Sequence, residues 1–297
     1  MIISQIIGGL GNQMFQYAVG RAVSLQKKQR FHLDVSGFAR YGLHHGFELE
    51  RIFKIDCSLA TSTDLAEVLG WQSDPRTRRV LARKPLAFLR RKELVFEPSL
   101  AYWPAIQKVP ESCYLSGYWQ SEKYFIHEAG QIREDFTFGT PFSETNEELA
   151  NLLSRINSVS LHIRRGDYVA NPANHSIYAS CSPEYYRNAA NFIAERIENP
   201  QFFIFSDDMD WVRNNLNLPF PTRYIDHNRG TESFNDMRLM SLCRHHIIAN
   251  STFSWWGAWL GTNLEKIVIA PEPWFESKTM ASQDLIPPNW HTLPKSD

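Results

Sequence analysis

Two adjacent arginines, Arg164 and Arg165, stand where an apolar run ends and a glycine follows. The stretch Leu161-His162-Ile163 is typical of a strand, and Gly166-Asp167 is typical of a turn after it. A guanidinium is always charged and presents planar N–H donors that fit two phosphate oxygens at once. One arginine aimed into a cleft therefore suits the pyrophosphate of a nucleotide-sugar. The plainer interpretation is an Arg–Asp pair that holds the turn.

A second candidate anion site is the glycine-rich stretch Gly8-Gly9-Leu10-Gly11, which follows an apolar run and precedes Asn12 and Gln13. Glycines let the backbone pass close to a ligand, and the helix expected next begins with unpaired N–H groups. The glycine spacing is not that of a dinucleotide-binding fingerprint, and no P-loop lysine follows. A tight strand-to-helix turn is the alternative. Asn12 and Gln13 either hydrogen-bond a ligand or cap the helix.

A third candidate is Asn250-Ser251-Thr252, which follows the strand-like run His245–Ala249. In open α/β sheets, phosphates bind where the carboxyl ends of strands face helix N-termini. Hydroxyls at this position bind a phosphate, cap the helix, or do both. The three tryptophans that follow share one helix face, so we expect them to pack in the core; they are Trp255, Trp256 and Trp259.

Several aspartates follow other predicted strands. Asp34 ends the run Phe31–Asp34, at the edge where parallel sheets place ligand-facing residues. Asp236 either accepts from the N1 and N2 donors of guanine or is an ordinary surface residue. A further cluster resembles the acidic groups with which some glycosyltransferases hold a metal, but it also opens a helix, where carboxylates offset the helix dipole without a metal; it comprises Asp207, Asp208 and Asp210. We expect no metal.

The elements that must position these residues alternate along the chain. Apolar runs separated by helical-length segments indicate parallel strands flanked by helices, an α/β protein; in the second half they are Val159–Ile163, Phe202–Phe205, Arg223–Ile225, His246–Ala249 and Ile267–Ala270. Helices are expected over Pro183–Glu198 and Thr231–Leu242. The segment Phe138–Asn146 has a loop composition and marks the expected domain boundary.

Size and composition narrow the classes of function. A chain of 297 residues is long enough for two domains, and a formal charge of −1 gives no general attraction to nucleic acid. The four cysteines show no metal-binding or disulfide-dense spacing, and no run is long enough to span a membrane. We expect a cytoplasmic protein, soluble or peripheral at the inner face of the membrane.

The segment Arg76–Lys92 contains eight basic residues among apolar ones, and Pro85 interrupts any single helix. Such a run is either a solvated face or a peripheral contact with anionic lipid. The second interpretation suits an acceptor carried on a membrane lipid.

With these stretches identified, the sequence resembles the bacterial GDP-fucose-dependent α-1,2-fucosyltransferases of glycosyltransferase family 11. The resemblance covers essentially the whole chain and rests on three stretches that occur in the order of the family: 9–17 (GLGNQMFQY), 162–168 (HIRRGDY) and 250–257 (NSTFSWWG). It implies a GT-B-like fold, with two Rossmann-like domains facing a cleft. Residues 1–140 would form the acceptor-side domain and residues 141–297 the nucleotide-sugar-binding domain, with no metal or other cofactor.

The resemblance also implies roles for individual residues. Arg164 would grip the β-phosphate, and Asn12 would face the fucose. The pyrophosphate would be lined by Ser251, Thr252 and Phe253, and the guanosine would lie near His162 and Asp236. Further donor-binding residues are expected at Gly11, Gln13, Arg165 and Asn250.

The implied reaction moves L-fucose from GDP-β-L-fucose to the 2-hydroxyl of a terminal galactoside in one inverting displacement. Three routes for the acceptor proton stay open: Asp34, Asp167, or a water path that ends at phosphate. Arg165 either binds the donor or holds Asp167 or a domain interface. The alternatives for the whole chain are fucose transfer to another position or acceptor, another GDP-sugar donor, and a glycan-binding module without catalysis.

Overall fold

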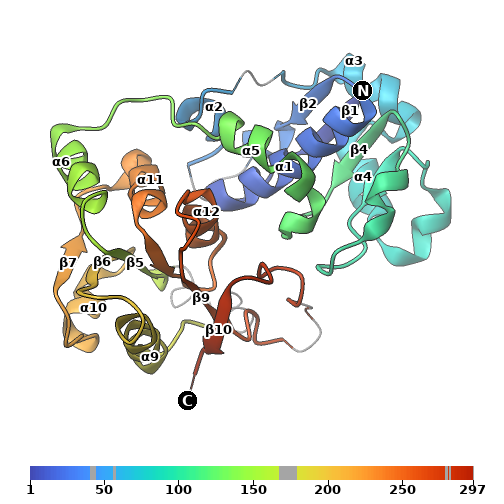
Figure 1. Cartoon of the computed structure of the whole chain (residues 1–297). Helices are drawn as coiled ribbons and strands as arrows, with labels where there is room; N and C mark the ends of the chain where they lie inside the picture. Colours follow the sequence, from blue (N-terminus) through green and yellow to red (C-terminus); the bar gives the residue numbers. More distant parts are fainter. Residues whose placement is uncertain (41–44, 56–57, 167–178, 278–279, 281, 297) are drawn as a thin grey trace. The chain divides into compact units, whose positions relative to one another are not determined.

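The structure is a computed structural model that describes residues 1–40, 45–55, 58–166, 179–277, 280 and 282–296 (Figure 1). The chain separates into two compact units. The first comprises Met1–Gly139 with Gln283–Leu285, and the second comprises Thr140–Ser282 with Ile286–Asp297. Residues 283–285 belong to the first unit although they lie far along the sequence, so a single domain boundary does not describe the division.

The first unit is built on a four-stranded sheet in the order β2-β1-β4-β3, with every neighbouring pair parallel. Its strands are β1 (Ile2–Gln5), β2 (Phe31–Asp34), β3 (Leu94–Phe96) and β4 (Cys113–Ser116). Its helices are α1 (Leu10–Lys27), α2 (Leu49–Ile52), α3 (Ser62–Leu69), α4 (Pro75–Leu81) and α5 (Ala129–Asp135). Parallel strands need crossovers, which α1 supplies between β1 and β2.

Helix α1 lies close against this sheet because Gly20 has no side chain. A Cβ atom at Gly20 would lie 2.4 Å from the ring of Phe31 on β2. Most of α1 is buried, and the residues from Gln13 to Gly20 are buried without a break, so the helix is enclosed on nearly all sides. This packing fixes the direction in which the N-terminus of α1 and its glycine turn point.

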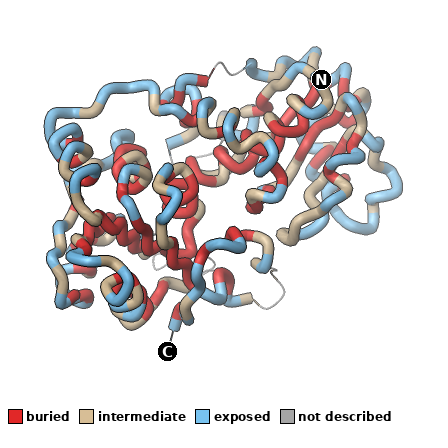
Figure 2. Tube along the Cα trace, viewed as in Figure 1, coloured by how far each residue is buried: buried red, intermediate tan, exposed pale blue. Residues whose placement is uncertain are grey.

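The second unit contains a six-stranded parallel sheet in the order β10-β9-β8-β5-β6-β7. Its strands are β5 (Ser158–Ile163), β6 (Gln201–Ser206), β7 (Thr222–Ile225), β8 (His245–Ile247), β9 (Val268–Glu272) and β10 (His291–Pro294). Its helices are α6 (Glu144–Leu153), α9 (Pro183–Ala194), α10 (Met209–Asn215), α11 (Phe234–Leu242) and α12 (Thr252–Leu260). Figure 2 shows the central strands of this sheet as a buried layer.

The two faces of this sheet are distinguished by alternation along β5. Val159, Leu161 and Ile163 join the hydrophobic core that α9 and α10 cover. Side chains alternate along a strand, so Ser160 and His162 point to the opposite face. Ser160 Oγ lies 2.9 Å from His246 Nδ1 of the neighbouring β8. The ring of His162 lies 5.7 Å from that of Phe253, on α12.

The α/β class and the two units, each built on a parallel sheet, match the expected GT-B-like construction from Rossmann-like halves. The five strands predicted in the second half are present, and β10 was not predicted. The three tryptophans of α12 are buried, as expected, and pack on one another. A cleft between the units stays a prediction from the resemblance.

The basic segment divides into two populations of side chains. Pro85 does separate two elements, α4 and a 3₁₀ helix over Lys84–Leu89. Arg78 is buried and donates to Asp34 across 3.0 Å, and Arg90 donates to three backbone carbonyl groups. These two arginines are bound within the unit, whereas the other six basic residues of the segment are exposed.

Candidate functional site

Most predicted nucleotide-binding residues of the second unit lie where neighbouring parallel strands end. Leu161 of β5 is in register with Ile247 of β8, and Ile163 with Ser206 of β6. The chain beyond these strands therefore leaves the sheet at one edge, the edge at which open α/β sheets bind ligands. Arg164 follows β5, Asp207 follows β6, and Ser251 comes shortly after β8.

Arg164 is held in place but keeps part of its guanidinium accessible. Its Nη1 lies 3.2 Å from Asp207 Oδ2, and the side chain is 28% exposed. Asp207 also accepts from the backbone N–H groups of Arg165 (2.9 Å) and Gly166 (3.0 Å). The carboxylate thus fixes the turn after β5 and pre-orients the arginine, which suits a phosphate-binding role.

Arg165 points to a different partner. Its Nε donates to Asp208 Oδ2 across 3.2 Å, and its guanidinium lies 3.8 Å from the centroid of the Trp211 ring. Both partners belong to the start of α10. The donor contact of Arg165 stays a prediction, and its predicted pair with Asp167 involves a residue outside the described part of the chain. Arg165 ties the β5 turn to α10.

The acidic cluster after β6 has structural partners. Asp208 caps α10 by accepting from the N–H of Trp211, and Asp207 binds the turn after β5. Asp208 therefore acts as a helix cap, and Asp207 holds the turn after β5 in place. Within the described part of the chain, no group of three histidine, cysteine, aspartate or glutamate side chains is placed to hold a metal ion.

The N-terminus of α12 combines a hydroxyl cap with a buried imidazole. Ser251 is the N-cap residue, and its hydroxyl accepts from the N–H of Phe253. Near the ring of Phe253, His162 is 5% exposed, and its Nδ1 has no hydrogen-bond partner among the described residues. Burial, reinforced by the charge of Arg164, lowers the pKa of His162 to about 3. The imidazole is therefore neutral at physiological pH.

Asn250 lies just before this helix and is buried. Its side-chain amide donates to the carbonyl groups of Ala179 and Trp274, both across 3.1 Å. The amide thereby ties together two loops beside the helix N-terminus. The predicted contact of Asn250 with the donor stays a prediction.

Asp236 belongs to a polar network that the sequence did not reveal. Asn228 donates to Asp236 Oδ1 across 2.8 Å, and Asn146 of α6 donates to Asn228 across 2.8 Å. His227 Nε2 lies 2.7 Å from Asn146 Oδ1. The tripeptide Asp226-His227-Asn228 follows β7 directly, so the rule that singled out the other strand ends would have found it.

The carboxyl group of Asp236 is largely removed from water. Desolvation raises its pKa to about 7; the hydrogen bond from Asn228 opposes this rise, and the charge of Asp226 adds to it. This aspartate is therefore not an ordinary surface residue. A ligand that donates N–H groups to Asp236 would therefore stabilise the charged form of its carboxyl group.

In the first unit, Gln13 is fully buried and its hydrogen-bonding groups are satisfied within the protein. Its amide donates to the carbonyls of Gly8 (2.9 Å) and Gly46 (2.8 Å) and accepts from the N–H of Glu48 (3.0 Å). No side chain caps α1 at Gly9, so the expected capping role of Asn12 or Gln13 is wrong. Gln13 braces the glycine turn from inside.

Asn12 and Gly11 occupy the first turn of α1. The Asn12 Oδ1 accepts from Gln120 across 2.9 Å, and its side chain packs against Gly8, whose φ is +80°. A Cβ at Gly8 would lie 2.9 Å from Asn12 Nδ2, so the turn requires glycine for two reasons. The predicted contact of Asn12 with fucose stays a prediction.

Asp34 is buried at the end of β2, and its carboxylate is occupied. Oδ2 accepts from Arg78 (3.0 Å) and from the Tyr114 hydroxyl (2.7 Å), and Oδ1 accepts from the N–H of Ser36 (3.0 Å). Three donors of the protein thus occupy both oxygens of this carboxylate. Asp167, the other predicted carboxylate, lies outside the described residues.

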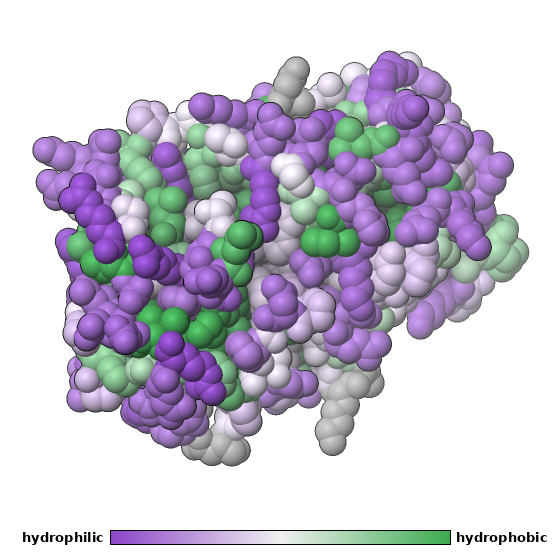
Figure 3. All heavy atoms as spheres, in the orientation of Figure 1, coloured by the Kyte–Doolittle hydropathy of each residue, from purple (hydrophilic) through white to green (hydrophobic). Residues whose placement is uncertain are grey.

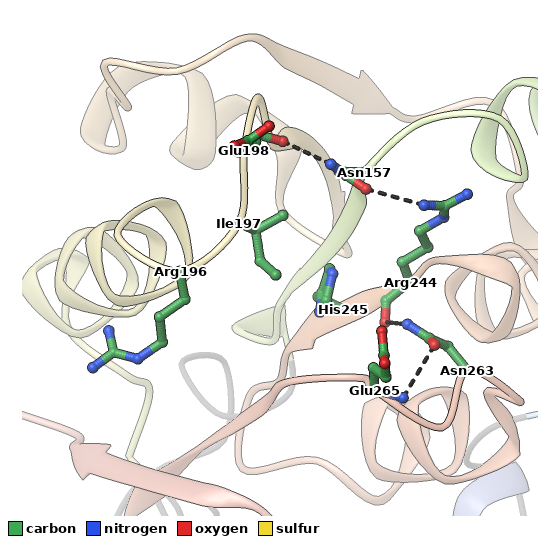
Figure 4. Close-up of a pocket in the computed structure, with 8 residues that line it drawn as sticks. All are labelled: Asn157, Arg196, Ile197, Glu198, Arg244, His245, Asn263 and Glu265. Atoms are coloured by element: carbon green, nitrogen blue, oxygen red, sulfur yellow. Dashed lines mark hydrogen bonds between the residues drawn. The ribbon is translucent and has the colours of Figure 1, made fainter.

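The opposite edge of the second sheet contains a polar pocket (Figure 4). It is lined by Asn157, Arg196, Ile197, Glu198, Arg244, His245, Asn263 and Glu265. Most of its polar groups bind one another, since Asn157 donates to the Glu198 carbonyl and accepts from Arg244. None of the predicted donor-binding residues lines it.

Taken together, a parallel α/β sheet whose carboxyl edge carries an oriented arginine and a hydroxyl-capped helix defines a nucleotide- or phosphate-binding class of protein. Comparisons with known proteins narrow this class. Residues 104–294 match the family described as Glycosyl transferase family 11.

An alpha-1,2-colitosyltransferase of Escherichia coli is 36% identical over 99% of this chain and 99% of its own length. The O-antigen biosynthesis glycosyltransferase WbnK, also of Escherichia coli, is 32% identical over 92% of this chain and 94% of its own length. The chain belongs to glycosyltransferase family 11.

Among solved structures, the fucosyltransferase NodZ from Bradyrhizobium aligns with 86% of this chain and 91% of its own, at 13% identity and a TM-score of 0.48. Separately, the helices within the described ranges include none long and apolar enough to cross a bilayer.

Proposed function

We propose that this glycosyltransferase moves L-fucose from GDP-β-L-fucose to the 2-hydroxyl of a terminal galactoside and forms an α-1,2 linkage. The observation that carries the proposal is the placement of Arg164 and the Ser251-capped helix after adjacent parallel strands of one sheet. An arginine and a helix N-terminus at one edge match the charge and shape of a pyrophosphate.

In this proposal, Arg164 binds the β-phosphate, and the N-terminal turn of α12, from Ser251 to Phe253, binds the pyrophosphate. His162 and Asp236 lie on the guanosine side. The carboxylate of Asp236 accepts from the N1 and N2 donors of guanine, and the neutral imidazole of His162 supplies a buried polar group whose Nδ1 is unpartnered among the described residues.

The reaction is a single displacement. The acceptor oxygen forms a bond to the anomeric carbon while the bond from that carbon to the phosphate oxygen breaks, and GDP leaves with the electron pair. Negative charge builds on the β-phosphate in the transition state, so Arg164 and the helix N-terminus act where they are needed most. Inversion at the anomeric carbon converts the β-linked donor to an α-linked product.

The acceptor hydroxyl must also lose its proton. Of the three routes considered, Asp34 is the one that the geometry favours least, because an arginine and a tyrosine already bind its carboxylate. Asp167 and a water path to the departing phosphate are the two routes that we retain.

The linkage and the acceptor are inferred from relatives. Two curated relatives carry the names alpha-1,2-colitosyltransferase and O-antigen biosynthesis glycosyltransferase. We therefore extend to this chain an α-1,2 linkage and a polysaccharide acceptor, such as a lipid-linked precursor. The galactose at the end of that acceptor is what the family resemblance implies.

The name of the first relative favours a second candidate donor. Colitose differs from L-fucose by the loss of the 3-hydroxyl, and the colitosyltransferase is 36% identical over nearly the whole chain. Discrimination between the two sugars depends on whether a buried group of the protein hydrogen-bonds this hydroxyl, which is worth several kcal/mol where it occurs. The described contacts assign no such group.

The experiment is a donor competition with purified enzyme in the presence of EDTA. GDP-fucose and GDP-colitose are offered at equal concentration with lactose and N-acetyllactosamine as acceptors, and products are linkage-typed. We expect α-1,2-fucosylated product. Preference for GDP-colitose would move the proposal to the second candidate, and turnover of neither donor would overturn both. Tight glycan binding without turnover or GDP binding would indicate a glycan-binding module instead.

A further inference from the structure

Beyond its proposed activity, we propose that the first unit docks on a membrane surface of anionic lipid through one patch, formed by residues 71–92. This membrane patch comprises the exposed apolar side chains Trp71, Val80, Phe88 and Leu89 and the exposed basic side chains Arg76, Arg79, Arg83, Lys84 and Lys92. The identification rests on exposure, charge and rigid positioning, each argued below.

The apolar members protrude to an unusual degree. Phe88 is 80% exposed, Trp71 is 63% exposed, and neither joins the hydrophobic core of Leu69, Leu81 and Leu94 beneath them. Large apolar side chains gathered on one surface mark an interaction site. Figure 3 shows hydrophobic atoms among hydrophilic ones at the margin of this unit, where the chain runs from α4 toward β3.

The charge around these side chains selects an anionic partner. Residues 70–92 contain eight Lys or Arg residues and one acidic residue, Asp74, whereas the whole chain has a formal charge of −1. Arg78 is neutralised inside the unit by Asp34. Arg76, Arg79, Arg83 and Lys84 lie on the surface, and no described acidic side chain lies within ion-pair distance of them.

Buried polar contacts hold the three segments of the patch in one arrangement. The Gln72 amide, fully buried, donates to the Leu89 carbonyl (2.8 Å) and accepts from the N–H of Arg91 (3.2 Å). Arg90 donates to the carbonyls of Leu81 (2.7 Å) and Ala82 (3.0 Å) at the end of α4. Trp71, the end of α4 and the pair Phe88-Leu89 are thereby fastened together.

An anionic bilayer is the occupant that these features match. Tryptophan and phenylalanine insert at the level of the lipid headgroups, while basic side chains bind the anionic lipids around them. Each basic residue near such a surface strengthens partition roughly fivefold, the equivalent of about 1 kcal/mol. A groove that binds another protein would present a concave apolar surface. The apolar side chains of the membrane patch instead protrude among basic side chains.

The test is co-flotation of the purified full chain with vesicles of phosphatidylcholine alone or with 30% phosphatidylglycerol, a fraction on the order of that in anionic membranes. Two patch variants are compared with the wild type: Phe88→Ser with Leu89→Ser, and Arg76→Ser with Arg79→Ser and Arg83→Ser. Each has a matched control: Leu264→Ser for the apolar pair, and the exposed trio Lys108→Ser, Arg155→Ser and Arg223→Ser for the basic trio. Leu264 is 99% exposed and lies in the second unit. Equal thermal midpoints establish that the variants are folded.

We expect the wild type to float with the vesicles that contain phosphatidylglycerol. With vesicles of phosphatidylcholine alone, it should remain at the bottom of the gradient. Loss of three patch charges should reduce the partition coefficient about 100-fold. Loss of the two apolar side chains should reduce it about tenfold. Equal flotation of patch and control variants, equal binding to neutral vesicles, or binding to a labelled oligonucleotide without vesicle binding would each overturn the proposal.

Discussion

Both units place a helix N-terminus after a parallel strand, yet the two termini are built differently. In the first unit, the turn Gly8-Gly9 directly before α1 has no capping side chain and is braced from inside by Gln13. In the second unit, the turn before α12 is capped by Ser251, and the adjacent strand ends in Arg164. The first terminus offers close approach of the backbone, whereas the second offers charge. A nucleotide diphosphate needs the second.

The largest effect that follows from this difference between the two helix N-termini is expected at Arg164. Replacing Arg164 by alanine should lower kcat about 10²- to 10³-fold, the equivalent of about 3 to 4 kcal/mol, because the charge on the departing phosphate loses its main donor. Initial rates with GDP-fucose and lactose measure the effect. Arg196→Ala is the matched control, because Arg196 lies in the pocket at the opposite edge of the same sheet. Similar losses in both variants would show that the arginine acts through folding.

In the first unit, the role of Gln13 as an internal brace of the turn before α1 can be tested by substitution. Gln13→Ala leaves two carbonyls and one N–H without the partner that the amide supplied, so we expect the free energy of unfolding to fall by about 3 kcal/mol. The thermal midpoint should fall by roughly 2 to 4 °C per kcal/mol. Gln26→Ala, on the exposed side of α1, is the control. An unchanged thermal midpoint together with a raised KM for the donor would indicate that Gln13 binds the donor instead.

Asp236 provides a pH-dependent test. Its pKa is raised to about 7, so guanine must displace a proton below that pH before the carboxylate can accept from N1 and N2. We expect the KM for the GDP-sugar to rise as the pH falls from 8 to 6, by up to about tenfold per pH unit. Asp236→Asn should remove most of this dependence. A KM with the same pH profile in both proteins would exclude Asp236 from the guanine site.

The same shift has a consequence for stability. The folded protein retains a proton on Asp236 that the unfolded chain, with an ordinary carboxyl pKa of 3.8, releases. The free energy of unfolding should therefore decrease as the pH rises from about 4 to about 7. Chemical denaturation of wild type and Asp236→Asn across this range measures the difference, independently of any ligand.

The sequence predicted the second unit better than the first for a physical reason. Strands β5, β6, β8 and β9 are buried on both faces, so they stand out as apolar runs. Strand β10 is mostly exposed, and β3 has three residues, so neither produces a pattern that distinguishes it from a loop.

The predictability of the site follows a similar division. Arg164 and Ser251 could be predicted because each follows its own strand in the sequence. Asn228, which follows β7, could have been found by the same rule. Its links to Asn146 and Asp236 could not, because these residues come from α6 and α11 and meet Asn228 only in the tertiary fold. The burial of Gln13 was hidden for the same reason, since two of its three hydrogen bonds reach residues more than 30 positions away.

The smallest expected effect separates the two neighbouring arginines. Arg164→Lys keeps a charge but loses the planar fork, so we expect at least a tenfold loss in kcat/KM if the fork binds phosphate. Arg165→Lys loses a contact with the Trp211 ring worth about 0.5 to 1 kcal/mol and should change kcat/KM less than about threefold. The two variants preserve net charge and differ by one position, so bulk electrostatics cannot explain a difference between them. A larger loss at Arg165 than at Arg164 would transfer the phosphate-binding role to the second arginine and leave Arg164 as the partner of Asp207 alone.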